Sequence, residues 1–213
     1  MKLLFRIIFK IFLILTILAG CATTEEIKET DSDELLNQGI ALLEEGQYDK
    51  AISDYNKAIE INSKDAEAYY NRGYAYGEKG EYDKAISDYT KAIEINPKDA
   101  KAYSNLGVAY DGKGQYDKAI SDYSKAIEIN PRYADAYYNR GVAYGEKGEY
   151  DKAISDYSKA IEINPKDAEA YDNRGLAYYR KGDYDKACSD WNRACELGSC
   201  KNYELVKRKG DCK

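Results

Sequence analysis

The chain has 213 residues, of which 32 are Lys or Arg, 38 are Asp or Glu and none is His. Three of the basic residues lie among the first 20, so the remainder has 29 basic against 38 acidic residues. This acidic balance excludes the usual nucleic-acid binder, which carries a basic surface. The lack of histidine removes the commonest proton-transfer group near neutral pH, so we expect no enzyme, no catalytic residue, no cofactor, no metal and no small-molecule substrate.

The N-terminus has a basic front followed by an apolar run, Ile11–Leu18, that ends in small residues. The run is too short to cross a hydrocarbon layer of about 30 Å comfortably. This pattern is typical of a secretory signal peptide, which we expect to occupy residues 1–20. An uncleaved anchor helix that begins at Leu3 is the alternative.

The end of this segment, Leu18–Cys21, reads LAGC and resembles the lipobox of bacterial lipoproteins. The resemblance implies that Cys21 carries a diacylglyceryl group and becomes the first residue of the mature chain. Two or three acyl chains anchor a protein stably to a membrane. Ala22 stands where an Asp tends to retain Gram-negative lipoproteins on the inner membrane, so we expect an exported protein on the periplasmic side of the outer membrane. Residues 21–31 are the expected flexible tether.

The rest of the chain repeats itself every 34 residues, which is the first sign to look for in a solenoid. One glycine series marks the period: Gly39, Gly73, Gly107, Gly141 and Gly175. A second glycine series, a tyrosine series and two alanine series keep the same step. The period defines five units over residues 32–65, 66–99, 100–133, 134–167 and 168–201.

Each unit is predicted to form a helix, a tight turn and a second helix. In the second unit, apolar or small residues fall at i, i+4 and i+7 on both helices, as one helix face requires: Tyr69, Gly73 and Tyr76, then Ala85, Tyr89 and Ala92. Gly80 separates the two runs, Pro97 cannot continue the second helix, and Asp99 is placed to cap the next one. Small residues on the buried faces allow the helix backbones to approach closely.

The unit resembles the tetratricopeptide repeat (TPR) in its large aromatic residue, Gly, Tyr, two Ala around an aromatic, and final Pro. The resemblance covers residues 32 to about 201, and the first and fifth units depart from the pattern, as terminal units do. It implies an all-α, right-handed α-solenoid of five helix-turn-helix units. Residues 202–213 are expected to form a C-terminal capping helix and a basic tail.

The resemblance also implies that the first helices line a concave groove that binds peptide segments. The candidate groove residues are Tyr70, Asn71, Tyr74, Asn105, Val108, Tyr138, Asn139, Val142, Asn173, Leu176 and Tyr179. An asparagine recurs once per unit, and its amide can donate to and accept from a peptide backbone. Alternatively, the asparagines belong to the repeat template and some of the tyrosines to the core. The acidic groove rim favours a basic or neutral partner.

Arg72, Arg140 and Arg174 stand at the seventh place of their units, where the family often has Leu. We expect their stems to cover neighbouring tyrosines while the guanidinium groups reach water, and a direct role in ligand binding is the alternative. The recurring acids are expected to form solvated faces.

Four cysteines remain after Cys21, and an even count in an exported protein suggests disulfides. Cys188 and Cys195 lie about 10.5 Å apart along one helix, which exceeds bridging distance. A capping helix that runs back would bring Cys212 to Cys188, and Cys195 would then pair with Cys200. A redox pair or a zinc site is the alternative use of these thiols.

We therefore expect a membrane-anchored TPR adaptor of the bacterial envelope that binds segments of other envelope proteins. The alternatives are a peptidoglycan- or glycan-binding lipoprotein, since tyrosines and acids also hold sugars, and a thiol oxidoreductase.

Overall fold

The computed structural model describes residues 31–200, 202–204 and 212, and this part of the chain contains helices and no strand. Residues 31–44 form the first helix. It is followed by α2 (Tyr48–Ile61), α3 (Ala66–Glu78), α4 (Tyr82–Ile95), α5 (Ala100–Gly112), α6 (Tyr116–Ile129), α7 (Ala134–Glu146), α8 (Tyr150–Ile163), α9 (Ala168–Lys181) and α10 (Tyr184–Glu196).

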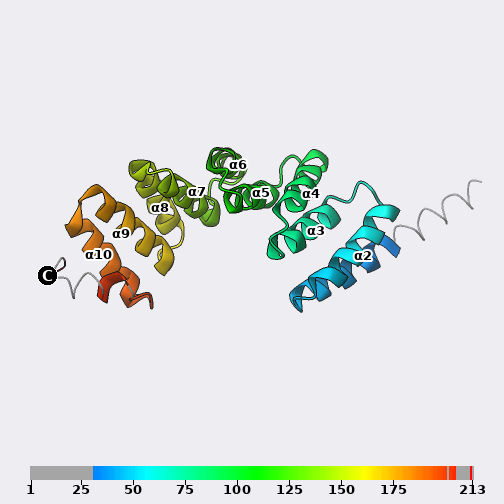
Figure 1. Ribbon diagram of the computed structural model, residues 1–213, viewed down its shortest axis with the longest axis horizontal. Helices are drawn as coiled ribbons and strands as arrows, with labels where there is room; N and C mark the ends of the chain where they lie inside the picture. The colour runs from blue at the N-terminus through cyan, green and yellow to red at the C-terminus, as the bar shows by residue number, and fades with distance from the viewer. Residues whose placement is uncertain (1–30, 201, 205–211, 213) are drawn as a thin grey trace, which may run out of the picture.

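The helices pack in antiparallel pairs that follow the 34-residue period, and the pairs stack into a long, curved array (Figure 1). Each helix from α3 to α9 contacts the one before it and the one after it. In addition, α3 contacts α5, α5 contacts α7 and α7 contacts α9. The first helices of neighbouring units therefore lie closest together, which places them on the inner side of the curve. The all-α solenoid predicted from the sequence is confirmed.

Local chemistry sets where the helices begin and end. Gly80 turns the chain between α3 and α4 with φ at 72°, a conformation that side chains with a Cβ rarely adopt. The Asp99 carboxylate accepts hydrogen bonds from the backbone N–H groups of Lys101 (2.8 Å) and Ala102 (3.1 Å), so it caps α5 as expected. At the start of α7, Tyr133 occupies the same place and supplies no side-chain cap.

The core is built from small residues packed against large aromatic rings. Ala85, Ala119 and Ala153 are fully buried, and Tyr123 is 1% exposed. A Cβ added at Gly107 would lie 2.6 Å from the Tyr123 ring. Close approach of the paired helices therefore depends on the glycine and the alanines, as the sequence suggests.

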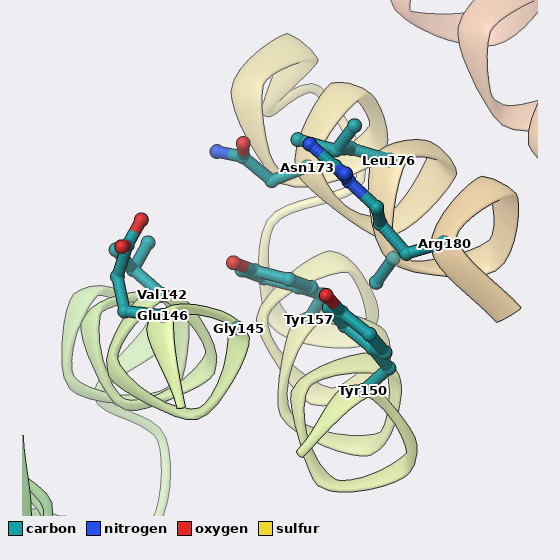
Figure 2. Close-up of a pocket in the computed structure, with 9 residues that line it drawn as sticks. Val142, Gly145, Glu146, Tyr150, Tyr157, Asn173, Leu176 and Arg180 are labelled. Atoms are coloured by element: carbon teal, nitrogen blue, oxygen red, sulfur yellow. The ribbon is translucent and has the colours of Figure 1, made fainter. Parts of the chain in front are cut away.

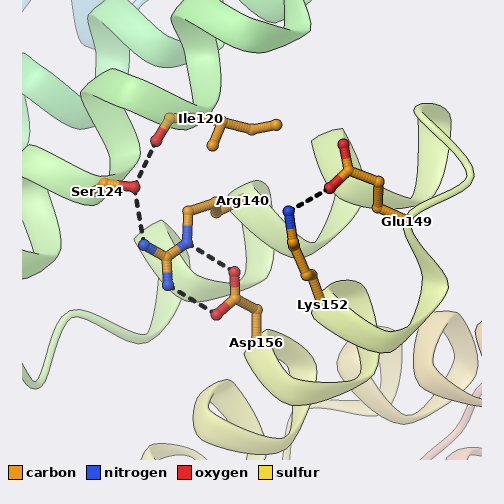
Figure 3. A network of polar contacts seen from close by, with 6 residues as sticks. All are labelled: Ile120, Ser124, Arg140, Glu149, Lys152 and Asp156. Atoms are coloured by element: carbon orange, nitrogen blue, oxygen red, sulfur yellow. Dashed lines mark hydrogen bonds and ion pairs between the residues drawn. The ribbon is translucent and has the colours of Figure 1, made fainter.

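The arginines lie differently from the expectation (Figure 3). Arg140 donates to both carboxylate oxygens of Asp156, from Nε at 2.7 Å and from Nη2 at 2.8 Å. Its Nη1 also donates to Ser124 Oγ in the preceding unit at 2.8 Å. The guanidinium does lie over the Tyr137 ring, at 5.7 Å, but the prediction that it reaches water was wrong. The cause is a carboxylate that stands 16 residues later, on the second helix of the same unit.

The same bridge occurs in two other units. Arg72 binds Asp88 and Asn56, and Arg174 binds Asp190 and Ser158. These carboxylates are 5–6% exposed. The prediction that the recurring acids form solvated faces was therefore wrong for Asp88, Asp156 and Asp190, because each has an arginine to neutralise it inside the stack. Each bridge joins its own helix pair to the preceding one.

A second set of ion pairs lies at the exposed turn edge, where a lysine of each of units two to five meets an aspartate 30 residues earlier. Lys79 and Asp49 are 2.6 Å apart, as are Lys147 and Asp117. The other pairs are Lys113 with Asp83 and Lys181 with Asp151. Exposed pairs of this kind contribute little to stability.

Two disulfides close the C-terminal end, in the pairing considered above. Cys188 is joined to Cys212 with 5.6 Å between their Cα atoms, and Cys195 to Cys200 with 4.0 Å. Cys212 is 7% exposed and packs with Trp191 and Ala187. Residues 202–204 are helical. The remainder of the predicted capping helix, the signal peptide and Cys21 lie outside the described residues.

Candidate functional site

Four side chains at the ninth place of the units form a row along the inner helices. Tyr74, Val108 and Leu176 are 39%, 44% and 39% exposed, which makes them three of the most exposed large apolar residues of the described chain. Val142 stands between Val108 and Leu176 in the series and is half-buried. We call these four residues the groove stripe. They form a discontinuous apolar track on α3, α5, α7 and α9.

A hollow of about 320 Å³ opens beside the C-terminal half of this stripe. Figure 2 shows Val142 and Glu146 of α7 on one side and Asn173, Leu176 and Arg180 of α9 on the other. Tyr150 and Tyr157 of α8 lie between them and direct their hydroxyl groups into the space. The lining is mostly polar, and Val142, Leu176 and Ala177 supply its apolar part. A ligand would therefore meet hydrogen-bonding groups beside a small apolar surface.

Two of the recurring asparagines are engaged inside the protein. The Asn105 amide donates to the hydroxyl of Tyr70 at 2.9 Å, and the Asn173 amide donates to that of Tyr138 at 2.7 Å. Burial raises the pKa of both tyrosines to about 12. These amides join neighbouring inner helices, so part of the asparagine series belongs to the repeat template.

Asn71 and Asn139 are different, because the preceding inner helix lacks the tyrosine. Leu36 and Ser104 stand at that place, and both are buried. Within residues 31–200, neither Asn71 nor Asn139 has a side-chain hydrogen-bonding partner in the protein. Both are half-buried on the inner helices. These amides are available to a ligand backbone.

The predicted tyrosines do not form one surface. Tyr70 and Tyr138 are half-buried against the rings of Tyr89 and Tyr157, with centroids 5.8 Å apart in both pairs. Tyr179 packs against Tyr184 at 5.2 Å and Trp191 at 5.5 Å, so its ring belongs to the packing of the last unit. Tyr74 is the predicted tyrosine whose ring is most available to a ligand.

Two acidic residues, one in unit three and one in unit four, belong to the acidic groove rim that the sequence predicts. Asp111 lies one turn after Val108 on α5, and Glu146 lies one turn after Val142 on α7. One Asp111 oxygen, Oδ1, is shielded from solvent and has no hydrogen-bonding partner. Burial, and then the charge of Glu146, raise the pKa of Asp111. The signal in the sequence was an aspartate where units two and four have Gly77 and Gly145.

No group of three or more metal-ligating side chains occurs within residues 31–200, 202–204 and 212. In the same part of the chain, every helix is too short or too polar to span a membrane.

Family models match most of the repeat region. One tetratricopeptide repeat model matches residues 66–99 and 134–167. A second matches residues 88–121 and 157–189. A TPR repeat model matches residues 39–80 and 112–148. A search of curated protein sequences found no match.

Solved structures are similar over nearly their whole length. The MamA protein is 33% identical with a TM-score of 0.72, and the match covers 84% of this chain and 94% of MamA. YrrB, described as a TPR protein with an unusual peptide-binding site, is 26% identical with a TM-score of 0.71, and the coverages are 89% and 97%. The thermophilic TPR protein TTC0263 of Thermus thermophilus is 25% identical with a TM-score of 0.62, and the coverages are 84% and 98%. The repeat signature, the stacked helix pairs and these matches agree, and the chain belongs to the tetratricopeptide repeat family.

Proposed function

We propose that this protein is a scaffold that binds extended segments of other proteins along the inner helices. The groove stripe is the observation that carries the proposal. It offers exposed apolar side chains at a constant step on successive helices, with the unpaired amides of Asn71 and Asn139 beside them. Apolar contacts supply affinity, and amides can bond both the N–H and the C=O groups of an extended backbone.

Two further facts support this function. TPR proteins are generally scaffolds without enzymatic activity, and the similar YrrB has a peptide-binding site. Each of the three half-buried arginines that binds an aspartate of its own helix pair also donates to a residue of the preceding pair, namely Asn56, Ser124 or Ser158, so the inner surface is preformed. A preformed surface loses less conformational entropy when a partner binds.

We also propose that the scaffold works at the bacterial cell envelope, anchored by lipid on Cys21. The lipobox-like LAGC sequence after a signal-like segment supports this location. The two disulfides support it as well, since disulfides persist in exported proteins. The outer membrane is favoured by Ala22. Partners would then be other envelope proteins.

Site-specific crosslinking in cells tests the binding surface. A photoreactive residue at Val108 should capture protein, because this side chain is the most exposed of the stripe. The same residue at Ser121, exposed on α6 of the same unit, is the matched control. Adducts from position 108 that are absent from position 121 support the groove. Equal adducts from both positions, or adducts with cell-wall glycan alone, would refute it.

Labelling tests the anchor separately. Cells fed a fatty acid with a detectable tag should attach it to the full chain and not to Cys21→Ser, because the thiol that carries the diacylglyceryl group is removed. Equal labelling of both, or labelling of neither, would remove the lipid-anchor proposal and leave the groove untouched.

A further inference from the structure

We infer that the preferred occupant of the groove is an extended segment that carries Lys or Arg, with one cationic side chain seated between Asp111 and Glu146. This inference rests on the proposed peptide-binding function and adds the charge of the partner. The stripe alone would accept any apolar segment, so the choice of occupant comes from the charged groups around it.

The charges on the inner helices are mostly negative. At the second, twelfth and thirteenth places of units two to five stand Glu67, Glu78, Asp111, Asp135, Glu146 and Glu169, with the bases Lys101 and Arg180. A segment with positive charge therefore complements this surface, and complementary potentials favour association with that segment over an acidic one.

Asp111 is the place where this charge is least compensated. Its Oδ1 atom is shielded from solvent without a hydrogen bond, and the repulsion from Glu146 adds to the cost of its ionised form. Across residues 31–200, no lysine or arginine lies within ion-pairing distance of either carboxylate. Half-buried charge without a partner is unfavourable, so a cation from a ligand would gain more here than at an exposed acid.

The neighbouring groups fit a Lys or Arg side chain. Val108 and Val142 precede the two acids by one helical turn on α5 and α7, so they stand beside the carboxylates on the same faces. An extended segment alternates its side chains, which lets an apolar residue contact the valines while its neighbour enters between the acids. Arg180 lies on α9, across the hollow from Glu146 (Figure 2), where it would repel a second cation and limit the preference to this junction.

Three peptides measured with the purified full chain test the inference. They share one neutral frame of Leu, Ser and Gly and carry three Lys, three Gln or three Glu. In fluorescence anisotropy, the Lys peptide should bind about tenfold more tightly than the Gln peptide, as one charged hydrogen bond supplies. The Glu peptide should bind most weakly, and the Lys advantage should shrink as NaCl is raised toward about 0.5 M.

Substitutions test whether Asp111 and Glu146 cause the preference for the Lys peptide. D111N should weaken the Lys peptide about five- to tenfold and leave the Gln peptide unchanged, and E146Q should act in the same direction. D185N removes the same charge from the exposed start of α10 and should change neither affinity. Thermal unfolding of D111N should be unchanged or shifted upward, which shows that lost binding is not lost folding.

The outcomes separate the two proposals. If the three peptides bind equally, or if D111N and D185N have equal effects, the cationic preference is wrong and the peptide groove stands. If the Glu peptide binds best, the preference is also wrong. If none of the three binds and crosslinking from position 108 yields nothing, the proposed function itself fails.

Discussion

The third unit, α5 and α6, and the fourth, α7 and α8, differ in the side chain that faces the aspartate of the second helix. In the fourth unit Arg140 neutralises Asp156 and reaches back to Ser124. In the third unit Leu106 stands in place of the arginine and is 7% exposed. Asp122, the counterpart of Asp156, has no cation among the described residues, and burial raises its pKa to about 6.

This difference shows that the helix pairs have the same backbone geometry in both units, although the polar partner of the template aspartate is present in only one of them. Leu106 joins an apolar cluster with Ala85, Tyr89 and Ala109, where the other units place a guanidinium. The junction between units two and three therefore has apolar packing where its neighbours have an arginine network. It keeps the Asn105–Tyr70 hydrogen bond and the Lys113–Asp83 ion pair. The template aspartate stabilises the stack only where an arginine faces it.

The largest effects should come from truncating the side chain at the seventh place of either unit. Arg140→Ala leaves Asp156 buried without its partner, and removing one member of such a pair costs about 3–5 kcal/mol. The side chains are 19% and 7% exposed, so we expect the lower part of that range. Urea unfolding of the full chain measures the loss. Leu106→Ala is the matched truncation in the third unit, and it should cost about 2–5 kcal/mol through its cavity.

Overpacking should affect the two units equally. Ala119→Leu in the third and Ala153→Leu in the fourth both insert volume at fully buried positions, at about 1–3 kcal/mol each. Thermal unfolding should give the same decrease for both within error. A much smaller loss in the third unit would mean that its packing is looser, and the comparison would then extend beyond one polar position.

Neutralising Asp122 should stabilise the third unit. Its carboxyl has a folded-state pKa of about 6 against an ordinary value of 3.8, so the native state holds the proton more tightly than the unfolded chain does. Stability from this group is therefore highest below pH 4 and falls as the pH rises from about 4 to 6. Asp122→Asn should remove that decline and add about 1–2 kcal/mol at pH 7, after allowance for partial exposure.

The control for this effect is Asp156→Asn, which leaves Arg140 without its carboxylate and should destabilise. Unfolding free energies measured from about pH 3.5 to 7 distinguish the two. If Asp122→Asn were neutral or destabilising at pH 7, the Asp122 carboxylate would have a stabilising partner in the folded chain, and the proposed difference between the two units would be wrong.

The smallest change in stability should follow Leu106→Arg, which restores the template. The new side chain would reach Asp122, with Thr90 in the place of Ser124, but apolar burial would be lost. Such exchanges are close to neutral, so we expect a change within about 1 kcal/mol. The pKa of Asp122 should fall, and the decline in stability between pH 4 and 6 should disappear. A decline that persists would show that the arginine does not reach the carboxylate.

Most of the fold could be predicted because each step depends on a repeated local signal. The 34-residue period fixes the helix pairs, Gly80 and its equivalents fix the turns, and the alanine series fixes the buried faces. The disulfide pairing was accessible in part: Cys188 and Cys195 stand two turns apart on one helix and cannot join each other, which leaves two pairings. The choice between those two depended on an assumed return of the C-terminal segment.

The arginine bridges could not be predicted with the same ease. Arg72, Arg140 and Arg174 each have an aspartate 16 residues later, but Leu106 does too, so the spacing alone does not identify a pair. Whether a long side chain turns into the stack or out to water depends on helix crossing geometry, which the period does not specify.

The positions of the candidate groove residues could be predicted, but the partners of their side chains could not. The inner-helix positions were accessible by family resemblance, but the use of each asparagine depends on its neighbour 35 residues earlier. The Asn105 amide donates a hydrogen bond to Tyr70, which stands 35 residues earlier. Asn139 has Ser104 at that place and makes no such bond. The sequence alone does not reveal this dependence, because the hydrogen bond joins side chains of two neighbouring units.

The most direct test of the peptide groove is the footprint of a bound segment on the folded chain. Methyl NMR spectra of the full chain, titrated with the Lys peptide, should show shifts for Val108, Val142 and Leu176 on the inner helices. Ile86 and Ile154, on second helices, should stay unmoved. Shifts confined to the second helices, or saturable binding that leaves the three inner methyl-bearing residues unchanged, would contradict the account.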